Sequence, residues 1–257
     1  MIRSLLFPAV FYPFTLLWAA GLVPFALLGS RPAVAGGILL YCRIVFFLLR
    51  ALAGIRVEIR GAERLPRNRA AFLISKHMSN LDPIVTFYLL PEMTALAKKE
   101  LFGVPFIGRL LRTLGIVRID RGAGTAHQQM PAILNEIKTK QRPLVVYPEG
   151  TRTRPGERRT LKSGAYYMHT ASKLPALPMC TNSGLHWPKG KAPMRPGTVI
   201  YEIGAPLEPW PDKAAYMRQV EERVMDRSDA LMRDDPVWAA AVAVPSAGRH
   251  SDESQDP

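Results

Sequence analysis

Acidic residues are missing from the first 57 positions of this sequence, which contain no aspartate and no glutamate. Acids are also scarce in the chain as a whole, because its 257 residues include 34 Lys and Arg against 21 Asp and Glu. The formal net charge of +13 at pH 7 favours acidic partners, a class that includes nucleic acid, anionic lipid and phosphorylated substrates. A chain of this length can form one large α/β domain or two small ones.

Cysteine is almost absent as well. The two cysteines, Cys42 and Cys180, provide neither a disulfide framework nor a metal-ligand spacing, so both are interpreted as packing residues. The five histidines are scattered and never form a paired metal-binding spacing such as HExxH. A metal site is therefore not expected.

Two long apolar stretches occupy the acid-free segment. They cover residues 5–28 and 33–55, and a short turn at 29–32 separates them. The first stretch has the length that spans a bilayer, at about 20 apolar residues. We expect residues 1–54 to form a membrane-embedded helical hairpin, and we favour a hairpin that can lie in one leaflet over two full spans.

Side chains within these stretches argue against two straight spanning helices. Three prolines would kink or interrupt the first helix. These prolines are Pro8, Pro13 and Pro24. In the second stretch, Arg43 and Arg50 lie on nearly one helical face, which suits a helix in the membrane interface with its guanidinium groups at the headgroups. A signal peptide is a weaker interpretation, because the apolar region before the cleavage-like sequence at 33–35 is too long.

Basic residues cluster directly after the hairpin, at positions 56, 60, 64, 67 and 69. By the positive-inside rule they favour a cytoplasmic position for the domain that follows. The expected location is therefore the membrane, at the cytoplasmic face of the inner (plasma) membrane.

Segments with the periodicity of strands and of helices alternate between residues 55 and 235. The expected strands cover residues 55–60, 71–75, 94–97, 116–120, 143–147, 176–180 and 198–203. The expected helices cover residues 83–90, 104–114, 125–140, 162–173 and 212–233. Such alternation predicts an α/β domain over residues 55–235, with a mostly parallel mixed sheet flanked by helices, in which ligands bind beyond the carboxyl ends of the strands. Residues 236–257 turn to alanine, serine and charge, and are expected to form a disordered tail.

A histidine and an aspartate lie at the tip of one expected strand, in the sequence Lys-His-Met-Ser-Asn-Leu-Asp-Pro at 76–83. His77 can take a proton near neutral pH, and a carboxylate such as that of Asp82 can fix its tautomer and stabilise the imidazolium. An offset of five residues does not place two side chains on one helical face. The pair can therefore meet only if the segment bends, and Ser79 and Asn80 suit a turn or a helix N-cap. On its own such a pair is more often a capping or core arrangement.

Two further strand ends carry arginine. Arg121 follows the fourth expected strand, and Arg152 closes the sequence Tyr-Pro-Glu-Gly-Thr-Arg at the end of the fifth. Both guanidinium groups suit a two-pronged grip on phosphate, while Gly150 lets the backbone approach a ligand and Thr151 adds a hydroxyl donor. Taken singly, each motif has a plain alternative, a surface charge in the first case and a polar loop with an internal salt bridge in the second.

Together the motifs resemble those of the 1-acylglycerol-3-phosphate acyltransferases, also called lysophosphatidic acid acyltransferases. His77 and Asp82 match a first motif of His, four residues and Asp. The other motifs are matched, in order, by residues 115–121, 147–152, 162–165 and 174–178. The resemblance spans residues 70–180. Arg118 departs from it, because the family more often has an apolar or aromatic residue there.

The resemblance implies an O-acyltransferase that moves a fatty acyl group from acyl-CoA or acyl carrier protein to the free hydroxyl of 1-acylglycerol 3-phosphate, giving phosphatidic acid. It implies that His77 acts as the general base and that Asp82 orients it. It also implies that the pocket for the acceptor phosphate is formed by Arg121, Glu149, Gly150, Thr151 and Arg152. Lys98 and Lys99, otherwise a solvated charge pair, are weaker candidates for contacts with the donor or the oxyanion.

Neither a metal nor a cofactor is implied, since the hydroxyl attacks the thioester directly and the acyl donor is a co-substrate. The implied partners are the membrane bilayer, the lysophospholipid and the acyl donor. A nucleic-acid binder would favour aromatic residues interleaved on a basic face. The acid-free apolar N-terminal segment makes such a partner unexpected. Two alternatives stay open. One is acylation of another lyso-lipid, such as a lyso-ornithine lipid, or of glycerol 3-phosphate, and the other is a non-catalytic, membrane-anchored protein that binds anionic lipid.

Overall fold

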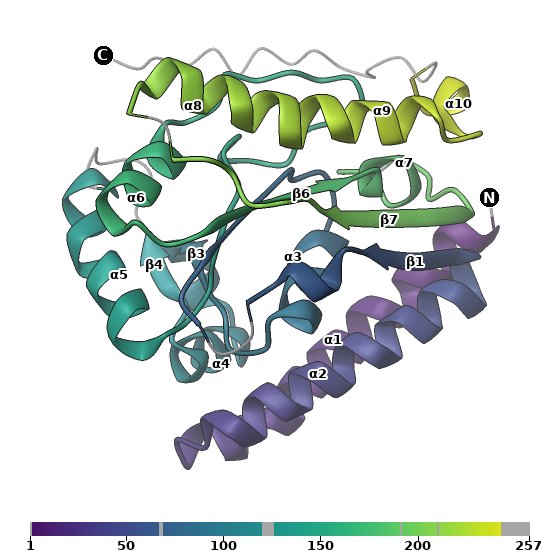
Figure 1. Cartoon of the computed structure of the whole chain (residues 1–257). Coiled ribbons are helices and arrows are strands. Elements are labelled where there is room, and N and C mark those ends of the chain that lie inside the picture. Colours follow the sequence, from purple (N-terminus) through teal and green to yellow (C-terminus); the bar gives the residue numbers. More distant parts are fainter. Residues whose placement is uncertain (1, 67–68, 120–125, 191, 210, 243–257) are drawn as a thin grey trace, which may run out of the picture.

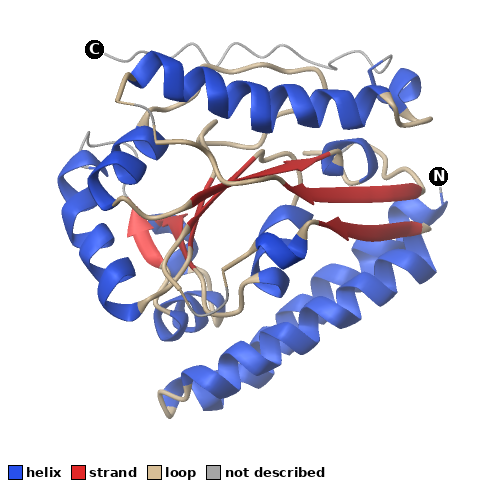
Figure 2. Cartoon of the chain, in the orientation of Figure 1, coloured by secondary structure: helices blue, strands red, loops and turns tan. Residues whose placement is uncertain are grey.

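The computed structural model describes residues 2–66, 69–119, 126–190, 192–209 and 211–242. Within these residues the sheet has seven strands, in the order β1-β7-β6-β2-β5-β3-β4 (Figures 1 and 2). The strands are β1 (Ile55–Arg60), β2 (Phe72–Ser75), β3 (Thr94–Lys98), β4 (Val117–Ile119), β5 (Leu144–Val146), β6 (Ala176–Thr181) and β7 (Gly197–Ile203). Neighbouring strands are parallel except for β6 and β7, which are antiparallel. The mostly parallel mixed sheet predicted from the sequence is therefore confirmed.

Helices flank this sheet (Figure 2). The first two are α1 (Ile2–Leu27) and α2 (Arg31–Leu48), and α2 continues as a π-helical turn at Leu49–Ala53. The next five are α3 (Leu81–Leu89), α4 (Ile107–Leu114), α5 (Ala126–Lys140), α6 (Gly164–Ser172) and the short α7 (Ser183–His186). The last helical run comprises α8 (Lys213–Val220), a π-helical stretch at Glu221–Asp226, α9 (Arg227–Arg233) and, after a break, α10 (Trp238–Val242). Short 3-10 helices lie at Ala62–Arg64 and Lys99–Gly103.

The central strand β2 is buried on both faces, which explains why its sequence is almost entirely apolar. Leu73 belongs to a core shared with α1, α2 and α3, whereas Phe72 and Ile74 belong to a second core shared with α5, α6 and α8. Successive side chains of a strand point to opposite faces, so one short strand contributes to both cores. The residues that follow β2 therefore begin at a fixed point in the middle of the molecule.

The expected hairpin is present, and its two helices lie side by side along one edge of the molecule (Figure 1). Leu5–Leu27 and Arg31–Ala53 are each long and apolar enough to cross a membrane, by length and composition. The first helix is not interrupted, because α1 continues through all three prolines. Tertiary packing explains this difference, since one side of α1 is buried in the protein core while Pro13 and Pro24 lie on the exposed side.

Both ends of the hairpin are fixed to the α/β part. Near the N-terminus, the rings of Phe7 and Phe11 pack edge-on against Trp187, with ring centroids 5.1 and 5.0 Å apart. At the turn between the two helices, Arg109 Nη2 donates a hydrogen bond of 3.2 Å to the carbonyl oxygen of Ala26. The hairpin and the sheet thus share one hydrophobic core.

The structure corrects the beginning of the expected disordered tail, because residues 236–242 are folded and include α10. Val237, Trp238 and Ala241 pack against a buried cluster. The cluster consists of Met78, Leu185 and Met232. Apolar side chains that cover such a cluster are removed from water, and composition alone does not reveal a partner so far away in the sequence. The rest of the expected tail, residues 243–257, lies outside the described residues.

Candidate active site

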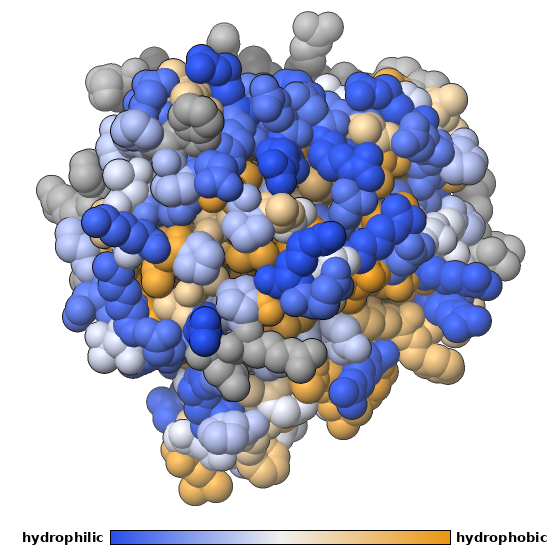
Figure 3. All heavy atoms as spheres, in the orientation of Figure 1, coloured by the Kyte–Doolittle hydropathy of each residue, from blue (hydrophilic) through white to orange (hydrophobic). Residues whose placement is uncertain are grey.

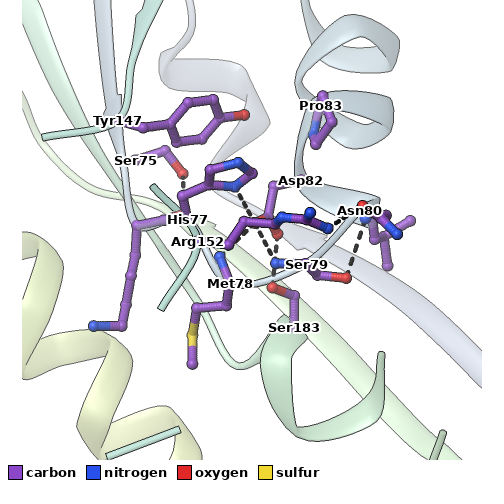
Figure 4. Close-up of polar contacts among 12 residues, drawn as sticks. Ser75, His77, Met78, Ser79, Asn80, Asp82, Pro83, Tyr147, Arg152 and Ser183 are labelled. Atoms are coloured by element: carbon purple, nitrogen blue, oxygen red, sulfur yellow. Dashed lines mark hydrogen bonds and ion pairs between the residues drawn. The ribbon is translucent and has the colours of Figure 1, made fainter. Parts of the chain in front are cut away.

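Two residues beyond the end of β2, His77 begins a turn that leads into α3. Its Nδ1 atom lies 2.8 Å from Asp82 Oδ2, so the two side chains meet although five positions separate them (Figure 4). The side chain of Asp82 is fully buried, whereas that of His77 is 19% exposed. Because Nδ1 is engaged by the carboxylate, the ring nitrogen left for a ligand is Nε2.

Asp82 stabilises the turn by accepting hydrogen bonds from its backbone. Its Oδ2 atom accepts the N–H groups of Met78 and Ser79 at 2.7 and 2.8 Å, in addition to the bond with His77. The N–H of Leu81 donates to Ser79 Oγ at 3.1 Å. The turn required by the offset of five is therefore formed. Asp82 lies in the first turn of α3, where the helix dipole favours a negative charge.

The other carboxylate oxygen of Asp82 is held by two hydroxyl groups from distant parts of the chain. Oδ1 accepts from Ser183 Oγ at 2.6 Å and from Tyr201 OH at 2.8 Å. Burial alone would raise the pKa of Asp82, but the hydrogen bonds from His77, Ser183 and the backbone outweigh it and lower that pKa. Asp82 is therefore an ionised acceptor, and it favours the tautomer of His77 that has a proton on Nδ1.

The ring of Tyr147 covers one face of the His77 imidazole. The two ring centroids are 4.2 Å apart and the planes differ by 23°. Tyr147 directly follows β5, which pairs with β2, so strand pairing produces the stack. Burial raises the pKa of Tyr147 and the Asp82 carboxylate raises it further, so the phenol stays neutral. The neutral ring orients His77 without competing for its proton.

The loop after Tyr147 is bonded to the backbone of His77 on both sides. The N–H of His77 donates to Glu149 Oε1 at 3.1 Å, and the carbonyl oxygen of His77 accepts the N–H and the hydroxyl of Thr153 at 2.8 and 3.2 Å. Glu149 is only 5% exposed, and burial is the main reason why its pKa is raised. Within the described residues its Oε2 atom has no hydrogen-bond partner. Glu149 thus supports the His77 backbone, and its contact with a phosphate stays a prediction.

Arg152 reaches back to the same turn. Its Nη1 atom donates to Asn80 Oδ1 (Figure 4). Its carbonyl oxygen accepts a hydrogen bond of 2.9 Å from Lys189 Nζ. Thr151 next to it is half-buried. The guanidinium group therefore lies beside the His77–Asp82 turn.

Gly150 adopts a φ angle of +70°, in the left-handed region that favours glycine. A Cβ atom at this position would lie 2.9 Å from Lys162 Cε and 3.3 Å from Lys162 Nζ. The ammonium group of Lys162 is therefore packed against the loop that precedes Arg152. Lys162 adds a cation to the predicted phosphate loop, a role that the sequence analysis did not assign to it.

The remaining predicted site residues are only partly described. Arg121 and the side chain of Lys98 lie outside the described residues, and Lys99 is exposed at the start of the 3-10 helix after β3. Parallel pairing of β2, β5, β3 and β4 places the carboxyl ends of these strands at one edge of the sheet, the edge where His77 lies. Among the residues that the structure describes, no group of three or more His, Cys, Asp or Glu could hold a metal ion.

Several residues that build the site escaped the sequence analysis. They are Tyr147 as a stacking partner, together with Thr153, Ser183 and Tyr201. Ser183 offered a signal, because it follows β6 in a polar Thr-Asn-Ser-Gly sequence, much as His77 follows β2. Tyr201 lies inside β7 and offered none, since an aromatic residue in a buried strand is ordinary.

Comparison with known proteins agrees with this geometry. Residues 56–182 match the family model described as Acyltransferase, and this stretch contains the His77–Asp82 pair and the loop with Glu149 and Arg152. The fold and the site therefore define an acyltransferase domain.

Residues 56–182 thus belong to the Acyltransferase family, and the chain is similar to the 1-acyl-sn-glycerol-3-phosphate acyltransferases. It is 33% identical over 165 residues to a protein of that name from Pseudomonas aeruginosa, with 64% of each chain covered. It is 31% identical over 143 residues to 1-acyl-sn-glycerol-3-phosphate acyltransferase alpha from Homo sapiens, covering 55% of this chain and 50% of the human one. The crystal structure of the LPA acyltransferase PlsC from Thermotoga maritima has the same fold, with a TM-score of 0.75, 24% identity and coverage of 90% and 96% of the two chains. The matched regions thus span less than two thirds of these two curated relatives.

Proposed function

We propose that this protein transfers a fatty acyl group from the thioester of acyl-CoA or acyl carrier protein to the free hydroxyl of 1-acylglycerol 3-phosphate, giving phosphatidic acid. The observation that carries the proposal is the His77–Asp82 pair, in which a buried carboxylate with five hydrogen-bond donors fixes an imidazole at an accessible position. A protein that only binds anionic lipid would need the basic residues but not this pair.

The geometry supports a single proton relay through His77. With its own proton on Nδ1, the ring accepts the proton of the acceptor hydroxyl at Nε2 while the hydroxyl oxygen attacks the thioester carbonyl carbon. Asp82 remains ionised and stabilises the imidazolium that forms. When the tetrahedral intermediate collapses, the carbon–sulfur bond breaks and the proton on Nε2 passes to the departing thiolate. The ester product and the free thiol then account for all atoms of the two substrates.

Recognition of the acceptor's phosphate is assigned to the basic residues around this pair. Arg152 lies beside the turn, and Lys162 is packed against the loop before it. Arg121 completes the predicted grip. Lys98 is the last residue of β3 and Lys99 follows it, at the same edge of the sheet. Guanidinium groups bind phosphate in a planar two-pronged geometry, which suits a headgroup that must be held while its hydroxyl reaches His77.

The hairpin would hold the site at a membrane surface, in one leaflet. With 26 residues, α1 is about 39 Å long, and contacts with the domain at both ends keep it along the domain surface. If it crossed the bilayer, it would draw that surface into the hydrocarbon. The outward side of α1 is apolar, and its exposed large side chains include Leu5, Leu6, Leu16, Leu17 and Leu27. Hydrophobic side chains also gather along the lower edge of Figure 3, where the hairpin lies. The cytoplasmic face remains the expected side, from the basic residues after the hairpin.

An assay of purified protein in lipid–detergent micelles tests the proposal. Oleoyl-CoA, palmitoyl-CoA and an acyl carrier protein thioester are each combined with 1-acylglycerol 3-phosphate, a lyso-ornithine lipid or glycerol 3-phosphate, and the acylated product is measured by mass spectrometry. Phosphatidic acid from the first acceptor, lost in a His77→Ala variant, is the expected result. Preference for another acceptor would favour the related lyso-lipid activity. If the protein bound anionic lipid but transferred no acyl group in any combination, the proposed acyltransferase activity would be refuted.

A further inference from the structure

A second histidine–aspartate pair lies outside the candidate active site. His186 Nε2 lies 2.9 Å from Asp235 Oδ2, and His186 Nδ1 lies 3.0 Å from the carbonyl oxygen of Arg195. The His186 side chain is fully buried and that of Asp235 is 10% exposed. Both ring nitrogens thus contact oxygen atoms, one on the Asp235 carboxylate and the other on the backbone of Arg195. Buried polar contacts of this kind contribute little net stability but can fix one arrangement of the segments that they join.

Asp235 fastens the end of the described chain to the region around α7. Besides the bond with His186, its Oδ2 atom accepts a hydrogen bond of 2.9 Å from Asn182 Nδ2. Farther along, Arg195 Nη2 donates to the carbonyl oxygen of Ala240 at 3.2 Å. Residues 235–242, which we call the C-terminal clasp, are thus bonded to neighbouring parts of the chain near both ends.

Helix α7 connects this second pair to the catalytic pair. Its first residue, Ser183, donates to Asp82 Oδ1 at 2.6 Å, and its last residue, His186, binds Asp235. The helix is only four residues long, so a displacement at one end is transmitted to the other. The placement of the Ser183 hydroxyl therefore depends on the contacts of His186.

Met78, the residue after His77, is enclosed between α7 and the clasp. It is fully buried, and Trp238 of the clasp packs against its cluster. A Cβ atom at Gly184 would lie 2.8 Å from Met78 Cε, so α7 and this side chain are in tight contact. Trp238 also lies near the loop after Arg152, because a Cβ atom at Gly156 would be 3.9 Å from its Cη2 atom. The clasp thus reaches both loops that form the site.

We propose that the C-terminal clasp is a positioning element for the catalytic turn. It holds Met78 directly and the hydroxyl of Ser183 through α7, and both contacts keep Asp82 bonded to His77. His186 and Asp235 act as positioning residues that take no proton from the substrate. The inference rests on the proposed function only where it assigns the clasp a part in acyl transfer.

Hydrogen–deuterium exchange and steady-state kinetics of four variants test this role in the full chain. Trp238→Ala removes the indole ring, and Trp238→Phe restores an aromatic ring. Asp235→Asn keeps the shape of the side chain and removes its charge. Asp234→Asn makes the same change at the exposed neighbouring position and is the matched control.

We expect amide exchange to be about tenfold faster in Trp238→Ala and Asp235→Asn, in the peptide that contains Met78 and Ser79. The N–H groups of these two residues donate to Asp82. Exchange in β5 should be unchanged. We expect kcat to fall by about tenfold with both KM values within about twofold of wild type, because a loosened turn misplaces His77 in the transition state more than it weakens binding. Trp238→Phe should recover most of both properties, and the control should match wild type.

Unchanged exchange in the catalytic turn of both variants would overturn the proposal, whether or not the protein is active. Faster exchange with an unchanged kcat per folded molecule would show a purely structural role and would overturn it too. If wild type transferred no acyl group but the exchange pattern were as expected, the proposed function would fail and the positioning of the turn would stand. If Trp238→Ala does not fold, the exchange and kcat of the isosteric Asp235→Asn variant alone test the proposal.

Discussion

Replacement of Asp82 by asparagine would remove the charge of the catalytic pair while keeping its shape. With the amide oxygen in the place of Oδ2, the side chain still accepts the two backbone N–H groups of the turn and the Nδ1–H of His77. The amide nitrogen then faces the hydroxyl groups of Ser183 and Tyr201, which can rotate to accept from it. The variant therefore keeps the tautomer of His77 and loses the negative charge that stabilises the imidazolium.

The expected loss follows from the distance between the two groups. With Nδ1 and Oδ2 2.8 Å apart, the imidazolium and the carboxylate lie in contact. At a separation of about 4 Å between charge centres and an effective dielectric constant of about 20, their attraction is about 4 kcal/mol. If the transition state loses this attraction, kcat falls by about 10³-fold, since each ~1.4 kcal/mol is a factor of ten. KM should change little, because the attraction that is lost acts on the imidazolium that forms in the transition state.

Thiol released from oleoyl-CoA, followed with a chromogenic thiol reagent, measures kcat and KM for the purified variant. The melting temperature of Asp82→Asn should stay close to that of wild type, whereas Asp82→Ala leaves buried N–H groups of the turn without an acceptor and should be less stable by about 2–4 kcal/mol. A kcat for Asp82→Asn within about fivefold of wild type would refute the role of the Asp82 charge in stabilising the imidazolium.

Three further substitutions probe other parts of the site. His77→Ala should lower kcat by about 10³-fold or more without shifting the melting temperature by more than a few degrees, and near-normal acylation would exclude the base. Arg152→Lys should raise the KM for the acceptor by about tenfold with kcat retained, because the two-pronged grip is lost, whereas the same change at the exposed Arg154 should have no effect. Lys76 is 1% exposed and burial lowers its pKa, so Lys76→Met should raise the free energy of unfolding by about 1 kcal/mol in urea titrations near pH 7. Because the unfolded chain binds more protons between the lowered pKa and 10.5, wild type should gain stability as pH rises through that window, and Lys76→Met should abolish the gain.

The sheet and the centre of the site could be predicted because their signals are local. The apolar runs of β2 and β5 mark strands that are buried on both faces, and the polar residues at their carboxyl ends are the ones that lie at the site. From the sequence, contact between His77 and Asp82 could be predicted only on the condition that the chain bends between them. The structure meets that condition through the backbone bonds of Asp82.

The supporting residues could not be predicted because their contacts connect distant parts of the chain. Ser183 and Tyr201 lie 101 and 119 positions from the aspartate that they hold. The clasp was mistaken for part of a disordered tail for the same reason, since Trp238 is ordered by a cluster that contains Met78. The composition of a segment indicates whether it can bury enough apolar surface by itself. It does not indicate whether the fold brings a distant apolar cluster into contact with it.

The core shared by the hairpin and the sheet has a consequence for how this protein would be extracted from a membrane. One side of α1 packs in the protein and the other side is apolar and outward-facing, so the hairpin presents a surface that lipid would cover. Removal of residues 1–54 would uncover the apolar side chains that α1 and α2 cover, and the remaining chain should aggregate. We therefore expect the lifetime of the extracted protein to depend on how well a detergent covers this apolar surface.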